Sequence, residues 1–223
     1  MTTAERDRVI AATVRMQRRR GLGVVVPGRM IGTAAHVIKR HDIWRRDAIG
    51  DAHFERVRAH SGRRFLADVY AVEAISDIAL LGEPDGQAFF KEHDDYQEIV
   101  DAIDPVPVFV DDFPRDERFT VHILTHNKGW VEAQARQVSR HGNVIATAAD
   151  GIDGGTSGGP VVIDDGRLIG VISTAGGTVG EPEREVTMAR FNMLPAPLVR
   201  TMLDPEWEVR LVREEIEHLE RPL

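Results

Sequence analysis

Short apolar stretches separated by turn-forming residues run through most of the chain. Residues 14–17 alternate between apolar and polar side chains, which is the period of a half-buried β-strand. Residues 21–26 and 30–34 flank a Pro-Gly turn, and this arrangement predicts a strand, a turn and a second strand. Further strands are predicted at residues 64–72, 77–81, 106–110, 120–124, 130–137, 144–148, 161–163, 168–173 and 186–192. Short strands at this spacing are typical of β-sandwiches and β-barrels.

A few segments have helical character instead. Residues 3–12 predict a short helix, with Thr2 or Thr3 as its N-cap and Glu5 in its first turn. Residues 89–103 are helical or irregular, and they end at an Asp-Pro pair that we take as the boundary between two lobes. Two further helices are predicted at residues 197–202 and 205–219.

The composition is that of a globular protein with a sizeable core. The 223 residues are 42% hydrophobic and 29% charged, which suits one two-lobed domain or two small ones. Cysteine is absent, so disulfides and thiolate chemistry are excluded, and a reducing compartment fits. No apolar run is long enough to span a bilayer, and the polar first eight residues show no secretory signal. We therefore predict a cytoplasmic protein with no membrane partner.

Charge is distributed unevenly along a chain whose formal net charge is −8. Residues 1–80 carry a net charge of +6, and residues 81–118 carry −9. Basic stretches at 18–20 and 56–64 raise the question of nucleic-acid binding. Aromatic residues make up only 6% of the chain and no nucleic-acid motif accompanies the charge. We interpret these stretches as solvated faces and predict no nucleic-acid partner.

Three short motifs carry the candidate chemistry. Residues 154–160 read G-G-T-S-G-G-P, residues 32–37 read G-T-A-A-H-V, and residues 76–81 read S-D-I-A-L-L. A serine among glycines exposes its hydroxyl and leaves neighbouring N–H groups free, and acyl transfer needs both. In this order and spacing the motifs resemble those of the trypsin-like, chymotrypsin-fold serine proteases, T-A-A-H, D-I-A-L and G-D/N-S-G-G-P. The resemblance extends from about residue 13 to about residue 203.

The resemblance implies an all-β fold made of two six-stranded antiparallel β-barrels. We expect a single peptidase domain over residues 1–223, with a short helix at its N-terminus. The N-terminal barrel would span about 13–104 and the C-terminal barrel about 105–192, followed by C-terminal helices at about 195–220.

The resemblance also assigns roles to individual residues. Ser157 would be the nucleophile, His36 the general base, and Asp77 the acceptor that orients the histidine. The N–H groups of Gly155 and Ser157 would form the oxyanion hole. Such a serine endopeptidase works through an acyl-enzyme intermediate and needs neither a cofactor nor a metal. Its substrate would be a polypeptide.

The specificity pocket is readable only from the same resemblance. The pocket floor falls on Gly151, so no acid selects a basic residue there, and we expect an apolar residue before the cleaved bond. Residues 170–176 match the strand that pairs with substrate backbone, which makes Ser173, Thr174 and Ala175 substrate-binding candidates. Ser173 also stands where the family has a serine that supports the triad aspartate. It could equally be a plain hydroxyl at the end of a strand.

Two departures point away from zymogen-type trypsins. Thr156 replaces the aspartate that pairs with a new N-terminus in trypsins, so we expect no activation by N-terminal insertion. Residues 191–199 resemble the ending of HtrA-like peptidase domains, but too few residues follow for a PDZ domain. We therefore expect narrow specificity or activation by a protein partner.

Other classes fit less well. The G-x-S-x-G pattern around Ser157 also occurs in α/β-hydrolases, but these need their histidine after the serine, and here only His218 follows. His122 and His126 have an i, i+4 spacing but lack the glutamate of a zinc helix, so we predict no metal site. The contrasting hypothesis is a pseudo-protease that keeps the fold as a peptide-binding or regulatory module.

Overall fold

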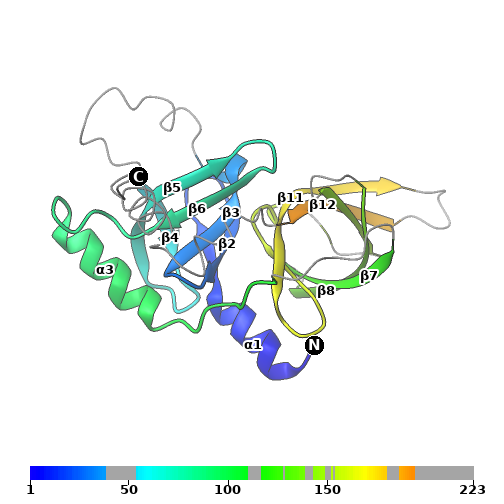
Figure 1. Ribbon diagram of the computed structural model, residues 1–223, viewed down its shortest axis with the longest axis horizontal. Helices are drawn as coiled ribbons and strands as arrows, with labels where there is room; N and C mark the ends of the chain where they lie inside the picture. Colours follow the sequence, from blue (N-terminus) through cyan, green and yellow to red (C-terminus); the bar gives the residue numbers. More distant parts are fainter. Residues whose placement is uncertain are drawn as a thin grey trace, which may run out of the picture.

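Two closed β-barrels lie side by side in the computed structural model (Figure 1). The structure describes residues 1–38, 54–109, 117–127, 129–138, 143–148, 152, 154–179 and 186–193. Both barrels are six-stranded and antiparallel, which confirms the fold predicted from the motifs. Among the described residues, no helix has the length and apolar character needed to cross a bilayer.

The N-terminal barrel closes in the order β1-β2-β3-β6-β5-β4. Its strands are β1 (Thr13–Met16), β2 (Gly21–Val26), β3 (Met30–Ala34), β4 (Phe54–Arg58), β5 (Arg64–Glu73) and β6 (Ile78–Gly82). Every residue of β2, β3 and β6 is buried. For β2 and β3 the reason is that one face lines the barrel core while the other contacts β10 and β11 of the second barrel. These strands therefore read as continuous apolar runs rather than as alternating ones.

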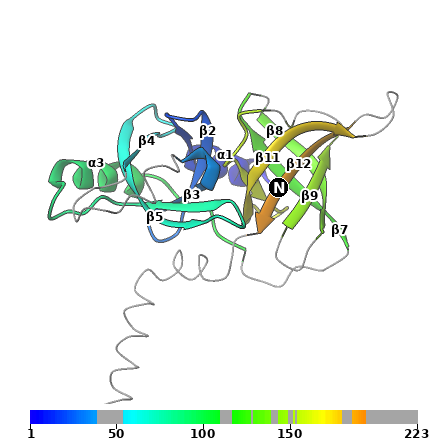
Figure 2. The same cartoon turned by 90° about the horizontal axis from the view of Figure 1, so that it is seen from above.

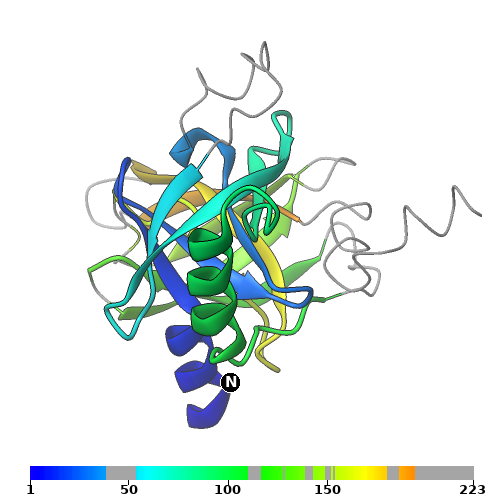
Figure 3. The ribbon, with the colours of Figure 1, turned by 90° about the vertical axis from the view of Figure 1, so that its left-hand side faces the viewer.

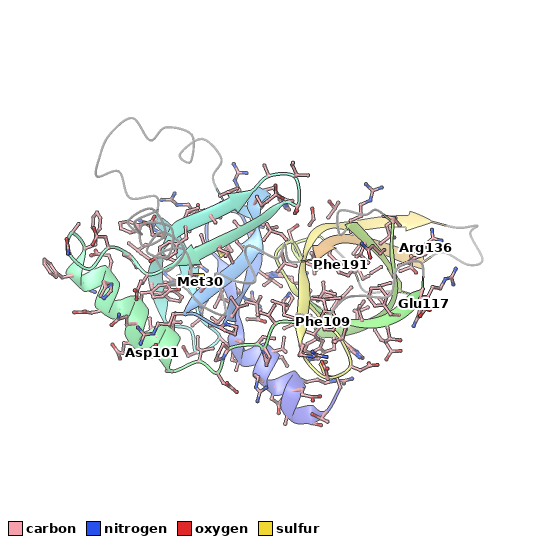
Figure 4. All side chains as sticks on the ribbon, in the orientation of Figure 1. Met30, Asp101, Phe109, Glu117, Arg136 and Phe191 are labelled. Atoms are coloured by element: carbon pink, nitrogen blue, oxygen red, sulfur yellow. The ribbon has the colours of Figure 1, made fainter. Side chains whose placement is uncertain are left out.

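The C-terminal barrel closes in the order β10-β11-β12-β9-β8-β7. Its strands are β7 (Arg118–Thr125), β8 (Gly129–Gln137), β9 (Asn143–Ala148), β10 (Pro160–Val162), β11 (Leu168–Val179) and β12 (Val186–Met193). The turn between β10 and β11 contains Gly166, whose φ of 78° is the left-handed conformation that glycine adopts without strain. Phe191 fills the interior of this barrel with 1% of its surface exposed (Figure 4).

Helix α1 (Thr3–Ala12) begins with a capping box. The Thr2 hydroxyl accepts a hydrogen bond from the Glu5 amide, and the Glu5 carboxylate accepts one from the Thr2 amide. Residues 3–12 are thus helical as predicted, with Thr2 as the cap. The helix lies at one edge of the junction of the two barrels (Figure 1 and Figure 2), where Glu5 abuts the turn at Gly166 and Val9 is buried in the N-terminal core.

Helix α3 (Phe90–Asp101) crosses the outside of the N-terminal barrel (Figure 3). Its apolar side buries Tyr96, which makes an edge-to-face contact with Phe65 of β5 and donates a hydrogen bond to the carbonyl of Arg29. Asp101 at the end of the helix forms a salt bridge with Arg29 at 2.8 Å. The segment that was helical or irregular by sequence is therefore a well-packed helix.

Two strand predictions need correction. Residues 106–110 do not form a strand of the barrel: the described part, up to Phe109, links the two barrels and makes one parallel bridge, between Val108 and Leu168. Its apolar residues are buried because this crossing lies against both barrels, with hydrogen bonds to Val25 and Leu168. Conversely, β4 was missed, because the charged Glu55 occupies a buried position and the apolar Phe54 a half-buried one, which hides the alternation around Val57. The predicted C-terminal helices at 195–220 lie outside the described residues.

Candidate active site

His36 lies on a single 3₁₀ turn, η1 (Ala35–Val37), directly after β3. The turn is fixed from below, since the Ala35 amide donates to the Asp77 carbonyl at 2.9 Å and the flanking Ala35 and Val37 are buried. The His36 side chain itself is 42% exposed. This geometry holds the half-exposed imidazole on a firmly fixed segment of backbone.

Asp77 immediately precedes β6 and has a φ of 55°, a conformation that is uncommon outside glycine. Its carboxylate accepts three hydrogen bonds. His36 Nδ1 lies 2.6 Å from Oδ2, the His36 amide donates to Oδ1 at 2.8 Å, and the Ser173 hydroxyl donates to Oδ2 at 2.6 Å. Because Ser173 belongs to β11, the carboxylate joins the two barrels.

These hydrogen bonds set the charge state of Asp77. Burial alone would raise the pKa of its carboxyl, but the hydrogen bonds from the His36 ring, the Ser173 hydroxyl and the His36 amide together hold the pKa below its ordinary value. The carboxylate is therefore ionised at neutral pH. An ionised Asp77 accepts a hydrogen bond from the Nδ1–H of His36, and this leaves Nε2 as the nitrogen that can take up a proton.

The Ser157 loop is tied to both barrels by its backbone. The Ser157 carbonyl accepts the Leu22 amide of β2 at 2.8 Å, and the Gly158 amide donates to the Ile172 carbonyl of β11 at 2.7 Å. Gly155 and Gly158 have φ values of 90° and 79°, so the loop depends on the backbone freedom of glycine. Neither the Gly155 nor the Ser157 amide donates to another group of the described chain, so both remain available to an anion.

A cleft of about 650 Å³ contains the residues that these elements position. Its lining includes His36, Ser157 and Gly155, together with Arg19, Arg20 and His126. No hydrogen bond joins the Ser157 hydroxyl to His36 in the described part of the chain. Such contacts often tighten only when substrate binds. The cleft therefore brings together a hydroxyl, an imidazole and two free amides.

Comparison with known families identifies the domain. The profile of the trypsin-like peptidase domain matches residues 21–171, which include His36, Asp77 and Ser157. The chain belongs to the trypsin-like peptidase family. A comparison with curated protein sequences finds no match.

Solved structures agree with this family at the level of the fold. The Rv3671c protease in an inactive form is 18% identical with a TM-score of 0.53, and the match covers 92% of this chain and 96% of that one. A serine-to-alanine variant of Rv3671c from M. tuberculosis, also inactive, is 18% identical with a TM-score of 0.54 over 90% and 89% of the two chains. A serine protease of human pathogenic astrovirus is 19% identical with a TM-score of 0.51 over 84% and 92%.

The structure places most of the predicted site residues of this trypsin-like peptidase near one another. His36, Asp77 and Ser173 are hydrogen-bonded, and Ser157 and Gly155 share the cleft with His36. Thr174 and Ala175 follow Ser173 on β11, where Thr174 is exposed. The remaining predicted residue, Gly151, lies outside the described residues.

Three other residues of the site were missed or interpreted differently from the sequence. His126 lies on the cleft wall against Gly155, while His122 points elsewhere and bonds Asp164 at 2.8 Å. Their i, i+4 spacing therefore has no common function. The sequence analysis treated Thr156 only as an uncharged replacement of an aspartate. In the structure it is fully buried, and its hydroxyl accepts a hydrogen bond from the His126 amide at 3.4 Å. Arg19, whose guanidinium donates to the His36 carbonyl at 2.9 Å, carried no signal beyond its charge.

Ser173→Ala is expected to lower the free energy of unfolding by about 1.5 kcal/mol at neutral pH, because it removes a hydrogen bond to a charged acceptor. Since the pKa of Asp77 is lowered in the folded state, the stabilisation is complete above the unfolded value of 3.8 and is lost as the pH falls below it. The difference between wild type and variant should therefore narrow below about pH 4 in chemical denaturation. Ser61→Ala, at an exposed turn, is the control and should show no such narrowing. A pH-independent difference would contradict this account.

Proposed function

We propose that this protein is a serine endopeptidase that uses Ser157, His36 and Asp77 as its catalytic triad. The family supports a peptidase, and a peptidase acts on polypeptides. The observation that carries the proposal is the 2.6 Å hydrogen bond between His36 Nδ1 and Asp77 Oδ2 at the wall of the cleft that contains Ser157.

The chemistry follows from the orientation of His36. Its Nε2 accepts the Ser157 proton as the serine oxygen attacks the substrate carbonyl, and the resulting oxyanion binds the amides of Gly155 and Ser157. The imidazolium, stabilised by Asp77, then gives its proton to the leaving amine as the C–N bond breaks. Water attacks the acyl-enzyme by the same steps, releases the acid product and restores Ser157.

Specificity and control are further parts of the proposal. We infer an apolar residue before the cleaved bond, since the family's pocket-floor position is Gly151. We also infer narrow specificity or activation by a protein partner, in the manner of HtrA-like peptidases. Rapid cleavage of a generic unfolded protein by the isolated chain would contradict this last inference.

A fluorophosphonate probe tests the catalytic proposal. The probe should label the wild-type protein at Ser157, and Ser157→Ala should abolish the labelling. Ser61→Ala is the control, since Ser61 lies in an exposed turn and is not among the described residues that line the cleft. Wild-type protein that stays unlabelled, alone and with cell extract as a source of partner, would favour the pseudo-protease instead.

A further inference from the structure

Three arginines form a row across the outside of the N-terminal barrel. Arg15 on β1 lies directly opposite Arg58 on β4, and Arg58 lies directly opposite Arg64 on β5. Residues that are directly opposite on antiparallel strands point to the same face, with Cβ atoms about 5 Å apart. All three side chains are exposed. We call these residues the arginine row.

The arginine row costs stability as it stands. Like charges directly opposite on neighbouring strands repel each other. Within the described residues, none of the three forms an ion pair with a carboxylate, whereas the neighbouring Arg63 pairs with Glu98 at 2.9 Å. A bound anion would relieve the repulsion through charge-assisted hydrogen bonds. An anion bound across the row would therefore be stabilising, and what distinguishes this row from other opposed arginines is the cavity beside it.

A cavity of about 380 Å³ lies beside the row. One side of it is formed by Arg15, Arg58 and His60 of the N-terminal barrel, and the other by Leu124, Thr125 and His126. Among the described residues, none that lines this cavity is acidic. The row thus borders a space into which an anionic segment can fit.

This cavity adjoins the candidate active-site cleft. His126 lines both of them, and Leu22, which lines the cavity, donates its amide to the Ser157 carbonyl at 2.8 Å. The cleft adds the basic residues Arg19 and Arg20, which belong to the turn that joins β1 to β2. A basic path therefore leads from beside Ser157 to the arginine row.

The strand β11 gives this path a direction. Under the proposed function, substrate residues before the cleaved bond pair with β11 at residues 173–175. Neither Ser173 nor Thr174 is among the described residues that line the cleft or the cavity. Under the same assumption, the substrate segment after the cleaved bond runs away from β11, past Arg20 and His126 of the cleft lining.

We propose that the arginine row and its adjoining cavity bind an acidic segment of the polypeptide substrate, located after the cleaved bond. The inference rests on the proposed peptidase function for its direction, but the binding itself does not need catalysis. Electrostatic attraction of this kind gives selectivity and speeds association, and salt screens it. It would supply part of the narrow specificity inferred above.

Binding is tested with the catalytically silent Ser157→Ala protein. A fluorescein-labelled deca-glutamate peptide is titrated at 50 and 300 mM salt, and anisotropy gives Kd. Adding Arg15→Gln and Arg58→Gln should weaken binding about tenfold at low salt, and the higher salt should remove most of the difference. The control adds Arg118→Gln and Arg136→Gln, a directly opposite pair on β7 and β8 that lines neither cavity. Figure 4 shows Arg136 on the side of the C-terminal barrel that faces away from the N-terminal barrel.

Cleavage assays test whether the acidic segment lies before or after the cleaved bond. Three peptides share one cleavage sequence from an unbiased library, with a glutamate stretch before the cleaved bond, after it, or absent. The peptide with glutamates after the bond should have the highest kcat/KM, and the Arg15/Arg58 double variant should remove that advantage. The double variant should unfold at the same temperature as wild type or higher, because it relieves repulsion.

The outcomes separate the two proposals. Equal Kd values for the Arg15/Arg58 and Arg118/Arg136 variants would overturn the acidic-segment site, as would a preference for glutamates before the bond. Tighter binding of a single-stranded oligonucleotide of equal charge would assign the row to nucleic acid and also overturn it. Absence of probe labelling and of cleavage would contradict only the peptidase, since the Kd comparison would still report on the row.

Discussion

Asp77→Asn is expected to lower kcat by about 10⁴-fold while the fold is kept. Asn presents an amide N–H₂ or a neutral oxygen where the carboxylate now accepts three hydrogen bonds, two of them from His36. His36 would lose the acceptor that holds its proton on Nδ1, and the imidazolium would lose its counter-charge. The measurement is kcat on a peptide obtained by library profiling, together with the rate of fluorophosphonate labelling.

Asp68→Asn is the matched control for this prediction. Asp68 lies on β5, and within the part of the chain that the structure describes its carboxylate accepts one hydrogen bond, from the Val69 amide at 2.8 Å. The same change of charge should therefore leave kcat within about twofold of wild type. If Asp77→Asn kept kcat within tenfold of wild type, Asp77 would not be the residue that orients the base.

Gly158→Ala is expected to lower the free energy of unfolding by at least about 4 kcal/mol, or to prevent folding. A Cβ atom at this position would lie 2.0 Å from the Leu22 carbonyl oxygen and 2.5 Å from Thr33 Oγ1, and the φ of 79° is itself unfavourable for alanine. The oxygen cannot move away easily, because Leu22 is held by β1 on one side and by the Ser157 carbonyl on the other. Thermal and chemical denaturation measure the effect.

Gly154→Ala provides the comparison in the same loop. A Cβ atom there meets nothing within 4 Å, and its φ is not in the left-handed region. The change should alter the free energy of unfolding by less than about 1 kcal/mol. Equal stability of the two variants would mean that the loop can move away from Leu22 and Thr33.

The sequence predicted an element correctly where the physical cause of that element lies within a few residues of it. The helix at 3–12 was predictable because its cap, Thr2, and its partner, Glu5, are three residues apart. The missed strand β4 shows the opposite case. Its exposed arginines become intelligible only when β1 and β5 place Arg15 and Arg64 beside Arg58.

The strand predicted at residues 106–110 was wrong for a related reason. Val106 and Val108 are apolar because they are buried, and a strand is the usual cause of a short apolar run. Here the cause is a crossing segment enclosed by two barrels, with hydrogen bonds to each. An apolar pattern in the sequence shows that residues are buried, but it does not show which part of the fold covers them.

The sequence by itself determined the elements and the chemical types of this protein. Its short apolar runs specify strands, its glycines specify the turns at Ser157, and its three motifs predict a histidine, an aspartate and a serine that work together. Only the tertiary structure decided which distant residues meet. Ser173 bonds Asp77 across 96 residues, His126 lines the wall of the cleft, and three arginines align across three strands. These contacts depend on register and barrel closure, which arise from the packing of the whole chain and leave no periodic signal in any one segment.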